Sequence, residues 1–133
     1  WRHSFSAVYV VYNIASKQVF ALSGTDQLLN AVWSPTGNSI AYVKDNNILY
    51  RQIDPLSEPI VVTTDGVLRE IFNGIQTWVY EEDVTGSYNA LWWSPDSTKI
   101  AFLRSNETLV QRISIPYYED PNVSLYPSQI VIP

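Results

Sequence analysis

The sequence predicts an all-β fold built from short antiparallel sheets, and three observations support this. Aromatic residues make up 14% of the chain, and together with β-branched residues they favour strands because they fit a pleated, half-buried surface. Short apolar runs alternate with turns rich in Gly, Pro, Asn and Asp, which is typical of antiparallel meanders. No long segment has the 3.6-residue period of an amphipathic helix.

A repeat divides the chain into two similar units. Each unit begins with Trp-Ser-Pro and continues, after a polar turn, with Ile-Ala and an aromatic residue. The first copy starts at Trp33 and the second starts 60 residues later, at Trp93. Because repeats of this kind decide the architecture, they take precedence over local propensities.

Each copy is expected to fold as three strands separated by polar turns. The predicted strands are 29–33, 39–43 and 48–52 in the first copy, and 90–93, 99–103 and 109–115 in the second. The turns between the second and third strands are 44–47 and 104–107. A hairpin precedes the first copy, with strands in 6–13 and 18–22.

The repeated unit resembles the blade signature of β-propellers, in which four-stranded sheets pack face to face around a channel. The sequence therefore predicts an all-β, partial β-propeller of about two blades plus parts of their neighbours. Trp33 and Trp93 are expected to be core residues between blades. Propellers have at least four blades, and both chain ends are apolar and strand-like, so residues 1–133 are expected to be a fragment of a larger propeller.

Composition excludes several classes of function. The formal net charge is −5 and no basic patch is visible, which argues against nucleic acid as a partner. The chain has no cysteine and a single histidine, His3, so disulfides and zinc–thiolate sites are excluded and no metal or other cofactor is expected. Neither a Gly-x-Ser-x-Gly elbow nor a phosphate-binding loop is present, and no run approaches the roughly 20 apolar residues of a membrane span.

An acidic run, Glu81-Glu82-Asp83, follows Trp78-Val79-Tyr80 and has no counterpart in the first copy. Neighbouring residues of a strand point to opposite faces, but a short helical turn or a bulge could direct two of these carboxylates at one point. A primary ammonium has three donors and one charge, and it could satisfy both groups. On spacing alone a solvated acidic loop without a ligand is favoured, and a calcium site lacks the alternating ligand pattern of an EF-hand.

Four segments together resemble the dipeptidyl peptidase IV family. They are Trp1-Arg2-His3-Ser4-Phe5, Asn73-Gly74-Ile75, Trp78-Val79-Tyr80-Glu81-Glu82 and Leu91-Trp92-Trp93-Ser94-Pro95. The resemblance implies an eight-bladed propeller that caps an α/β-hydrolase domain. The hydrolase domain would follow the propeller and carry the Ser-Asp-His triad, none of which is in this chain.

The resemblance also implies a set of substrate-binding residues. Glu82 and Asp83 match the two glutamates that bind the free N-terminus of the substrate. Glu81 matches a preceding, less critical glutamate, and Arg2 matches an arginine that contacts the substrate backbone carbonyl and steadies the acidic pair. The chain departs from the family at two positions: Asp83 replaces a glutamate, which shortens its reach by one methylene, and Thr77 replaces an aspartate.

The expected function is therefore that of the substrate-recognition segment of a serine-type dipeptidyl aminopeptidase, with peptides that carry a free N-terminus as partners. The alternative is a non-catalytic, dipeptidyl-peptidase-like accessory protein. The resemblance implies that the full protein forms a homodimer and enters the secretory pathway, where it would be extracellular, vacuolar or anchored as a type II membrane protein. Two glycosylation sequons, at Asn106 and Asn122, favour that route weakly.

Overall fold

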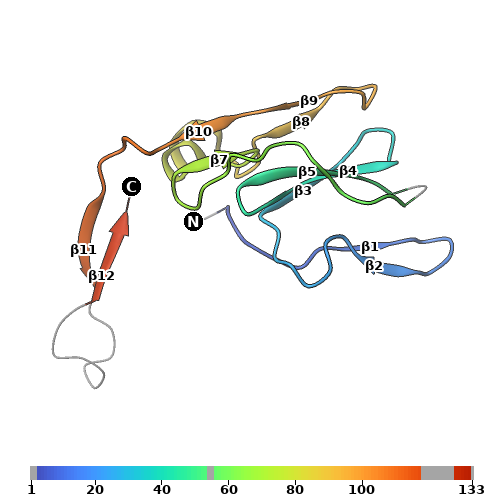
Figure 1. Ribbon diagram of the computed structural model, residues 1–133, viewed down its shortest axis with the longest axis horizontal. Helices are drawn as coiled ribbons and strands as arrows, with labels where there is room; N and C mark the ends of the chain where they lie inside the picture. The colour runs from blue at the N-terminus through green and yellow to red at the C-terminus, as the bar shows by residue number, and fades with distance from the viewer. Residues whose placement is uncertain (1–2, 54–55, 118–127, 133) are drawn as a thin grey trace, which may run out of the picture.

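The computed structural model describes residues 3–53, 56–117 and 128–132, and within these ranges the chain is built mainly from antiparallel strands (Figure 1). The first strands form a hairpin, β1 (Val10–Tyr12) and β2 (Val19–Ala21). A four-stranded sheet follows, with β3 (Asn30–Trp33), β4 (Ser39–Lys44), β5 (Asn47–Gln52) and β6 (Ile60–Val61) in sequential order. This meander has the form of one propeller blade, and its first three strands confirm the predicted ones.

The second repeat forms a more interrupted sheet. Its elements are β7 (Ile71–Asn73), a helical segment η1 (Tyr80–Thr85), β8 (Leu91–Trp93), β9 (Ile100–Phe102) and β10 (Arg104–Asn106). β8 pairs with β9, and β7 pairs with β10. A last hairpin, β11 (Ile113–Tyr117) with β12 (Ser128–Ile132), extends away from the stacked sheets at the left of Figure 1.

Matching hydrogen bonds confirm the repeat. In the first copy the N–H of Ser34 donates to the carbonyl of Ser39 at 2.8 Å, and in the second the N–H of Ser94 donates to the carbonyl of Lys99 at 2.9 Å. Trp33 pairs with Ile40 in the same register in which Trp93 pairs with Ile100. The two copies therefore share their turn as well as their strands.

The four-stranded sheet β3–β6, here called the middle sheet, contributes to an apolar cluster on each of its faces, as a blade between two neighbours requires. Alternate residues of a strand point to opposite faces. Ile40 and Tyr42 of β4 accordingly enter one apolar cluster with Val11, Leu22 and Leu28 of the hairpin side. Ala41 and Val43, which alternate with them along β4, enter a second cluster on the other face, together with Ile48 of β5, Ile75 and Leu91.

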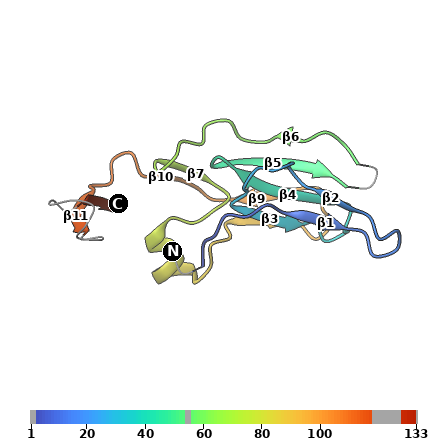
Figure 2. The same cartoon turned by 90° about the horizontal axis from the view of Figure 1, so that it is seen from below.

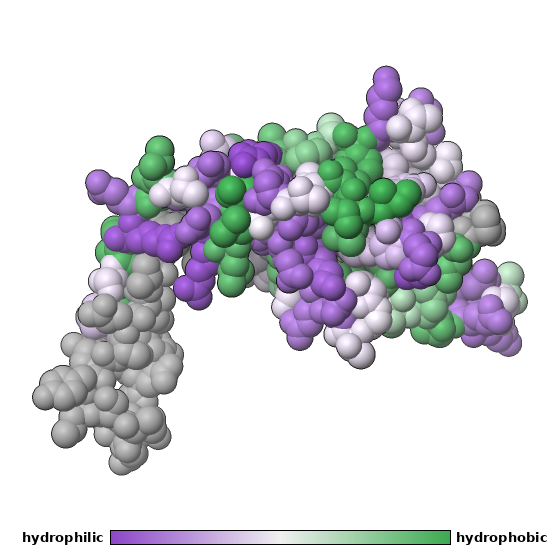
Figure 3. All heavy atoms as spheres, viewed as in Figure 1, coloured by the Kyte–Doolittle hydropathy of each residue, from purple (hydrophilic) through white to green (hydrophobic). Residues whose placement is uncertain are grey.

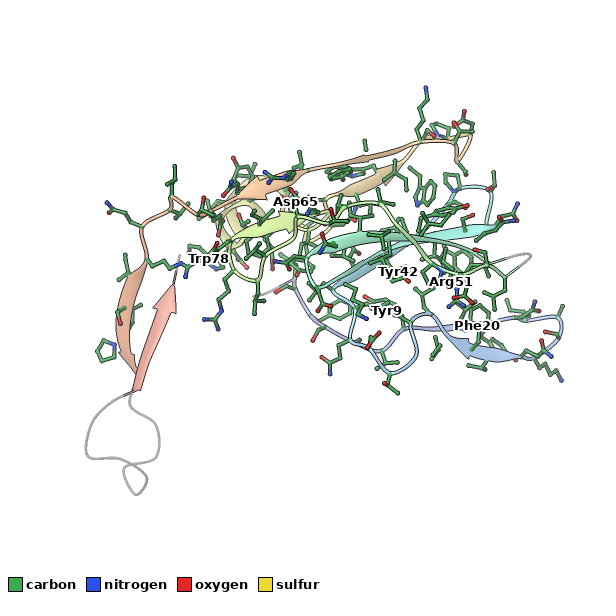
Figure 4. The ribbon with its side chains drawn as sticks, in the orientation of Figure 1. Tyr9, Phe20, Tyr42, Arg51, Asp65 and Trp78 are labelled. Carbon is green, nitrogen blue, oxygen red and sulfur yellow. The ribbon has the colours of Figure 1, made fainter. Side chains whose placement is uncertain are left out.

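A cation–π contact supports the interface between the hairpin and the middle sheet. The Arg51 guanidinium carbon lies 5.9 Å from the centre of the Phe20 ring, and an Arg51 side-chain N–H donates to the carbonyl of Leu22 at 2.6 Å. In Figure 4 Phe20 lies on the hairpin and Arg51 on the sheet that faces it. Figure 2, turned by 90°, also shows the hairpin beside this sheet.

Two expectations for the second copy are wrong. Residues 104–107, expected as a polar turn, contain β10, because their backbone pairs with β7 and the Arg104 side chain reaches Asp65 at 2.6 Å. The strand expected at 109–115 begins only at Ile113, since the chain turns first, with the N–H of Val110 donating to the carbonyl of Glu107 at 3.0 Å.

The two repeated tryptophans have different environments. Trp93 packs against the second cluster, and its indole N–H donates to the carbonyl of Val32 at 3.1 Å across the two sheets. Trp33 is 49% exposed, so the expectation that it is a core residue is wrong for this chain. Trp33 borders a cavity of about 260 Å³ between the hairpin and the middle sheet, because the hairpin does not cover it.

Open sheets leave many large apolar side chains at the surface. Figure 3 shows apolar patches among the hydrophilic residues of one face. Ile60 and Val61 of the outer strand β6 are among the exposed side chains, as are Val10 and Val19 of the hairpin. The described residues therefore form a partial propeller, with blade surfaces uncovered by neighbours.

Candidate functional site

The acidic run lies on an excursion of the chain between β7 and β8. β7 and β8 run in the same direction and pair with successive parts of one antiparallel partner, β10 and then β9. Hydrogen bonds close the base of the excursion: the N–H of Gly74 donates to the carbonyl of Leu103 at 3.0 Å, and the N–H of Ala90 donates to the carbonyl of Gly74 at 3.2 Å. Residues 75–89 thus leave the sheet and return to it at nearly the same place, as in a compact surface loop.

The tip of this excursion is helical, which confirms the helical turn considered for the acidic run. η1 is a π-helix that follows Val79 in right-handed helical conformation and ends at Gly86, whose φ of 61° lies in the left-handed region. A glycine in that conformation is a common helix terminator because it has no Cβ. Single-turn π segments are rare and are frequently found at functional sites.

The three carboxylates of η1 lie in different environments. The Glu81 side chain is fully buried, Glu82 is half-buried, and Asp83 is exposed. Glu81 therefore differs from Glu82 and Asp83 in being inaccessible to solvent.

Glu81 joins the excursion to the start of the chain. Its Oε1 accepts a hydrogen bond of 2.6 Å from the backbone N–H of His3. No donor contacts Oε2 within the part of the chain that the structure describes. The Glu81 charge also acts on Tyr88: burial, followed by this charge, raises the pKa of the Tyr88 hydroxyl to about 12.

A cavity of about 240 Å³ lies beside the returning half of the excursion. Its described lining combines the first residues of the chain, the β3 region and the loop after η1, namely His3, Phe5, Tyr9, Leu29, Asn30 and residues 86–89. The three carboxylates of η1 are not among these described lining residues. The cavity is thus adjacent to the acidic turn without containing it.

Sequence reasoning singled out the acidic run but missed the contact that it makes with a distant segment. The His3–Glu81 hydrogen bond joins residues 78 positions apart, and no local pattern signals it. Gln76 was also missed: it is buried, and its side-chain amide has no partner among the described residues. A buried polar residue next to an acidic run carries no signal in the sequence, because burial there depends on tertiary packing.

Some of the predicted site residues have no described position. Arg2 and Asn122 lie outside the described residues. Asn106 is exposed at the end of β10, where its side-chain oxygen accepts hydrogen bonds from the N–H and the hydroxyl of Thr108. Among the described residues there is no group of three or more His, Asp or Glu that could hold a metal ion, and no helix in the same ranges is long and apolar enough to cross a membrane.

Comparisons with known proteins agree on one family. The family model described as "Dipeptidyl peptidase IV (DPP IV) N-terminal region" matches residues 1–133. A Neurospora crassa protein named "Probable dipeptidyl-aminopeptidase B" is 43% identical over 121 residues, which cover 89% of this chain and 13% of that protein. "Dipeptidyl peptidase 4" of Bos taurus is 38% identical over 136 residues, which cover 100% of this chain and 17% of that protein.

A solved structure gives the same result. The crystal structure of Porphyromonas gingivalis dipeptidyl peptidase 4 superposes with a TM-score of 0.86 at 36% sequence identity, covering 98% of this chain and 18% of that chain. The chain therefore spans less than a fifth of the length of each of these relatives.

Proposed function

Because the chain belongs to the dipeptidyl peptidase IV family, as part of its N-terminal region, we propose that it is the substrate-recognition propeller segment of a serine-type dipeptidyl aminopeptidase. In this proposal Glu82 and Asp83 bind the protonated N-terminus of a peptide. A hydrolase domain outside this chain cleaves the peptide after its second residue.

The position of the acidic run on η1 is the observation that carries this proposal. Successive residues of an α-helix are about 100° apart around its axis, and this angle is smaller in the wider π-helix. Glu82 and Asp83 therefore leave adjacent sides of η1, one half-buried and the other exposed. Two adjacent carboxylates repel each other, and a ligand that brings one positive charge and three donors removes that repulsion.

Dipeptide release follows from a fixed distance between anchor and nucleophile. An ammonium held at Glu82 and Asp83 leaves room for two residues before the serine of the hydrolase domain. Fixing the substrate in this way lowers the entropic part of the barrier. Arg2 is assigned a supporting role in this scheme, as the residue that binds the substrate carbonyl and steadies the acidic pair.

The test is a substitution in the full-length protein. Glu82→Ala is expected to lower kcat/KM for a dipeptidyl chromogenic substrate by about ten- to a hundredfold, because a hydrogen-bonded contact to a charged group contributes roughly 1.5–3 kcal/mol and 1.4 kcal/mol corresponds to a factor of about ten. The measurement is steady-state kinetics on enzyme whose active serine has been titrated.

A control variant shows whether a loss of activity is specific to Glu82. Glu58→Ala removes an exposed carboxylate from the turn before β6 and is expected to leave the kinetics unchanged. Wild-type turnover in Glu82→Ala would overturn the proposal.

Downstream sequence without a Gly-x-Ser-x-Gly elbow and later Asp and His would favour a non-catalytic accessory protein instead.

A further inference from the structure

The buried carboxylate of η1 performs a task different from that of its two neighbours. Glu81 is 0% exposed, so it cannot reach a peptide bound at the surface of the turn. An ionisable group that is buried is costly unless it is hydrogen-bonded. The bond that Glu81 makes is with the backbone N–H of His3, at 2.6 Å.

This contact links two segments that are otherwise far apart in the chain. Glu81 is itself held by the excursion, since its N–H donates to the carbonyl of Thr77 at 2.9 Å. On the other side, the His3 N–H belongs to the peptide bond that joins His3 to Arg2. Hydrogen bonds from an amide to a carboxylate are short and are roughly twice as strong as neutral ones. The contact therefore connects the acidic turn to the chain backbone at His3.

We propose that Glu81 is a positioning residue, which ties η1 to the chain backbone at His3 and so fixes the orientation of the turn that carries Glu82 and Asp83. This inference rests on the proposed function, because it assigns Glu81 a role in the same site. The carboxylate acts through the backbone of another segment and does not touch the substrate. The role requires an acceptor oxygen at this depth, and the negative charge strengthens the bond to it.

The experiment compares variants of Glu81 in the full-length enzyme. Glu81→Ala removes the acceptor and is expected to raise KM for a dipeptidyl substrate at least about tenfold, as expected when a hydrogen bond to a charged group is lost. Glu81→Gln keeps an acceptor oxygen at the same reach but makes a weaker, neutral bond, and its KM is expected to lie between those of wild type and Glu81→Ala. A purely structural residue would lower the melting temperature and the yield of titratable enzyme but would leave KM per active site unchanged.

The donor side of the bond provides a matched pair. His3→Pro removes the N–H, since proline has no backbone donor, whereas His3→Ala keeps it. We expect a raised KM in His3→Pro and a KM within about threefold of wild type in His3→Ala. In the double variant Glu81→Ala with His3→Pro, the second substitution is expected to add little, because both remove the same bond.

Several results would overturn the inference. One is an unchanged KM in folded Glu81→Ala or His3→Pro enzyme, and another is a loss in Glu81→Gln as severe as that in Glu82→Ala, which would mean that the Glu81 charge binds substrate directly. If neither Glu81→Ala nor His3→Pro folds, Glu81→Asp withdraws the acceptor by one methylene; a raised KM supports the inference and a wild-type KM contradicts it.

Glu82→Ala separates this inference from the proposed function. If Glu82→Ala lowers kcat/KM as expected while Glu81→Ala has the wild-type KM, only the positioning role fails. If Glu82→Ala cleaves like wild type, the anchoring function itself fails.

Discussion

At the scale of single residues, glycines determine where the chain can turn sharply. Gly74, at the base of the excursion, has a φ of 74°, and a Cβ there would lie 3.0 Å from Ile48 Cγ1 and 3.2 Å from Val43 Cγ2. Gly37, in the turn of the first repeat, has a similar φ of 77° but open space around the Cβ position. The two positions share one conformational requirement and differ in packing.

This difference predicts unequal costs for the same substitution. Gly37→Ala is expected to destabilise the protein by about 1–2 kcal/mol through its left-handed conformation. Gly74→Ala adds overpacking in the core, typically about 1–3 kcal/mol more, and should also displace the excursion. Thermal unfolding of the two full-length variants checks this, and equal melting temperatures would contradict the packing argument.

At the scale of elements, a polar network stabilises the base of the excursion. Arg104 of β10 and Asn73 of β7 are directly paired across the strands, and both contact Asp65. The Arg104 Nε–H donates to Asp65 Oδ2 at 2.6 Å, and the Asn73 amide donates to Asp65 Oδ1 at 3.0 Å. These two contacts, that of Arg104 first, hold the pKa of the Asp65 carboxyl below its usual value.

The lowered pKa predicts a pH dependence of stability. A carboxyl whose folded pKa is depressed contributes stability above its unfolded pKa of about 3.9, and that contribution is lost as the pH falls through the folded pKa. Asp65→Asn should therefore flatten the fall in melting temperature between about pH 5 and the acid limit of the folded protein. Arg104→Gln removes the main partner of Asp65 and should flatten this dependence in the same way. A dependence of melting temperature on pH that is unchanged in Asp65→Asn would contradict the assignment.

At the scale of the whole molecule, the first hairpin, the four-stranded sheet and the paired strands of the second copy stack side by side, and hydrogen bonds as well as apolar clusters join them. The Trp93 indole N–H donates to the carbonyl of Val32 at 3.1 Å. The turns of the two repeats also meet, since the N–H of Thr36 donates to the hydroxyl of Ser97 at 3.1 Å. The repeated motif thus contributes to the packing of one copy on the other.

Loss of the indole donor is therefore expected to weaken the stack. Trp93→Phe keeps an aromatic ring and removes the bond to Val32, which should cost about 1 kcal/mol. The melting temperature of the full-length variant measures this loss. Tyr12→Phe, which removes a hydroxyl from an exposed ring on the hairpin, is the control and should unfold like wild type; a similar shift in both variants would contradict an inter-sheet role for Trp93.

Much of the architecture was predictable because local, repeated sequence patterns specify it. The strands of the first blade follow from alternating apolar residues and turn residues, and the repeat of Trp-Ser-Pro predicted a second sheet with the same turn. The helical tip at 81–83 was open to prediction as well, since adjacent carboxylates fit a helical turn better than a strand. Residues 104–107 were misassigned because their polar character is typical of turns, whereas their backbone pairs with β7.

The sequence by itself determined the fold class, the repeat, the family resemblance and the location of the acidic run, because each is encoded in residues close together in the chain. Only the tertiary structure decided that Glu81 is buried against the His3 amide while Asp83 faces solvent, and that Trp33 lies open while Trp93 is packed. The physical reason is that burial and hydrogen bonding depend on which distant segments come into contact. Adjacent residues of the same type, such as Glu81 and Glu82, do not reveal this in the local sequence.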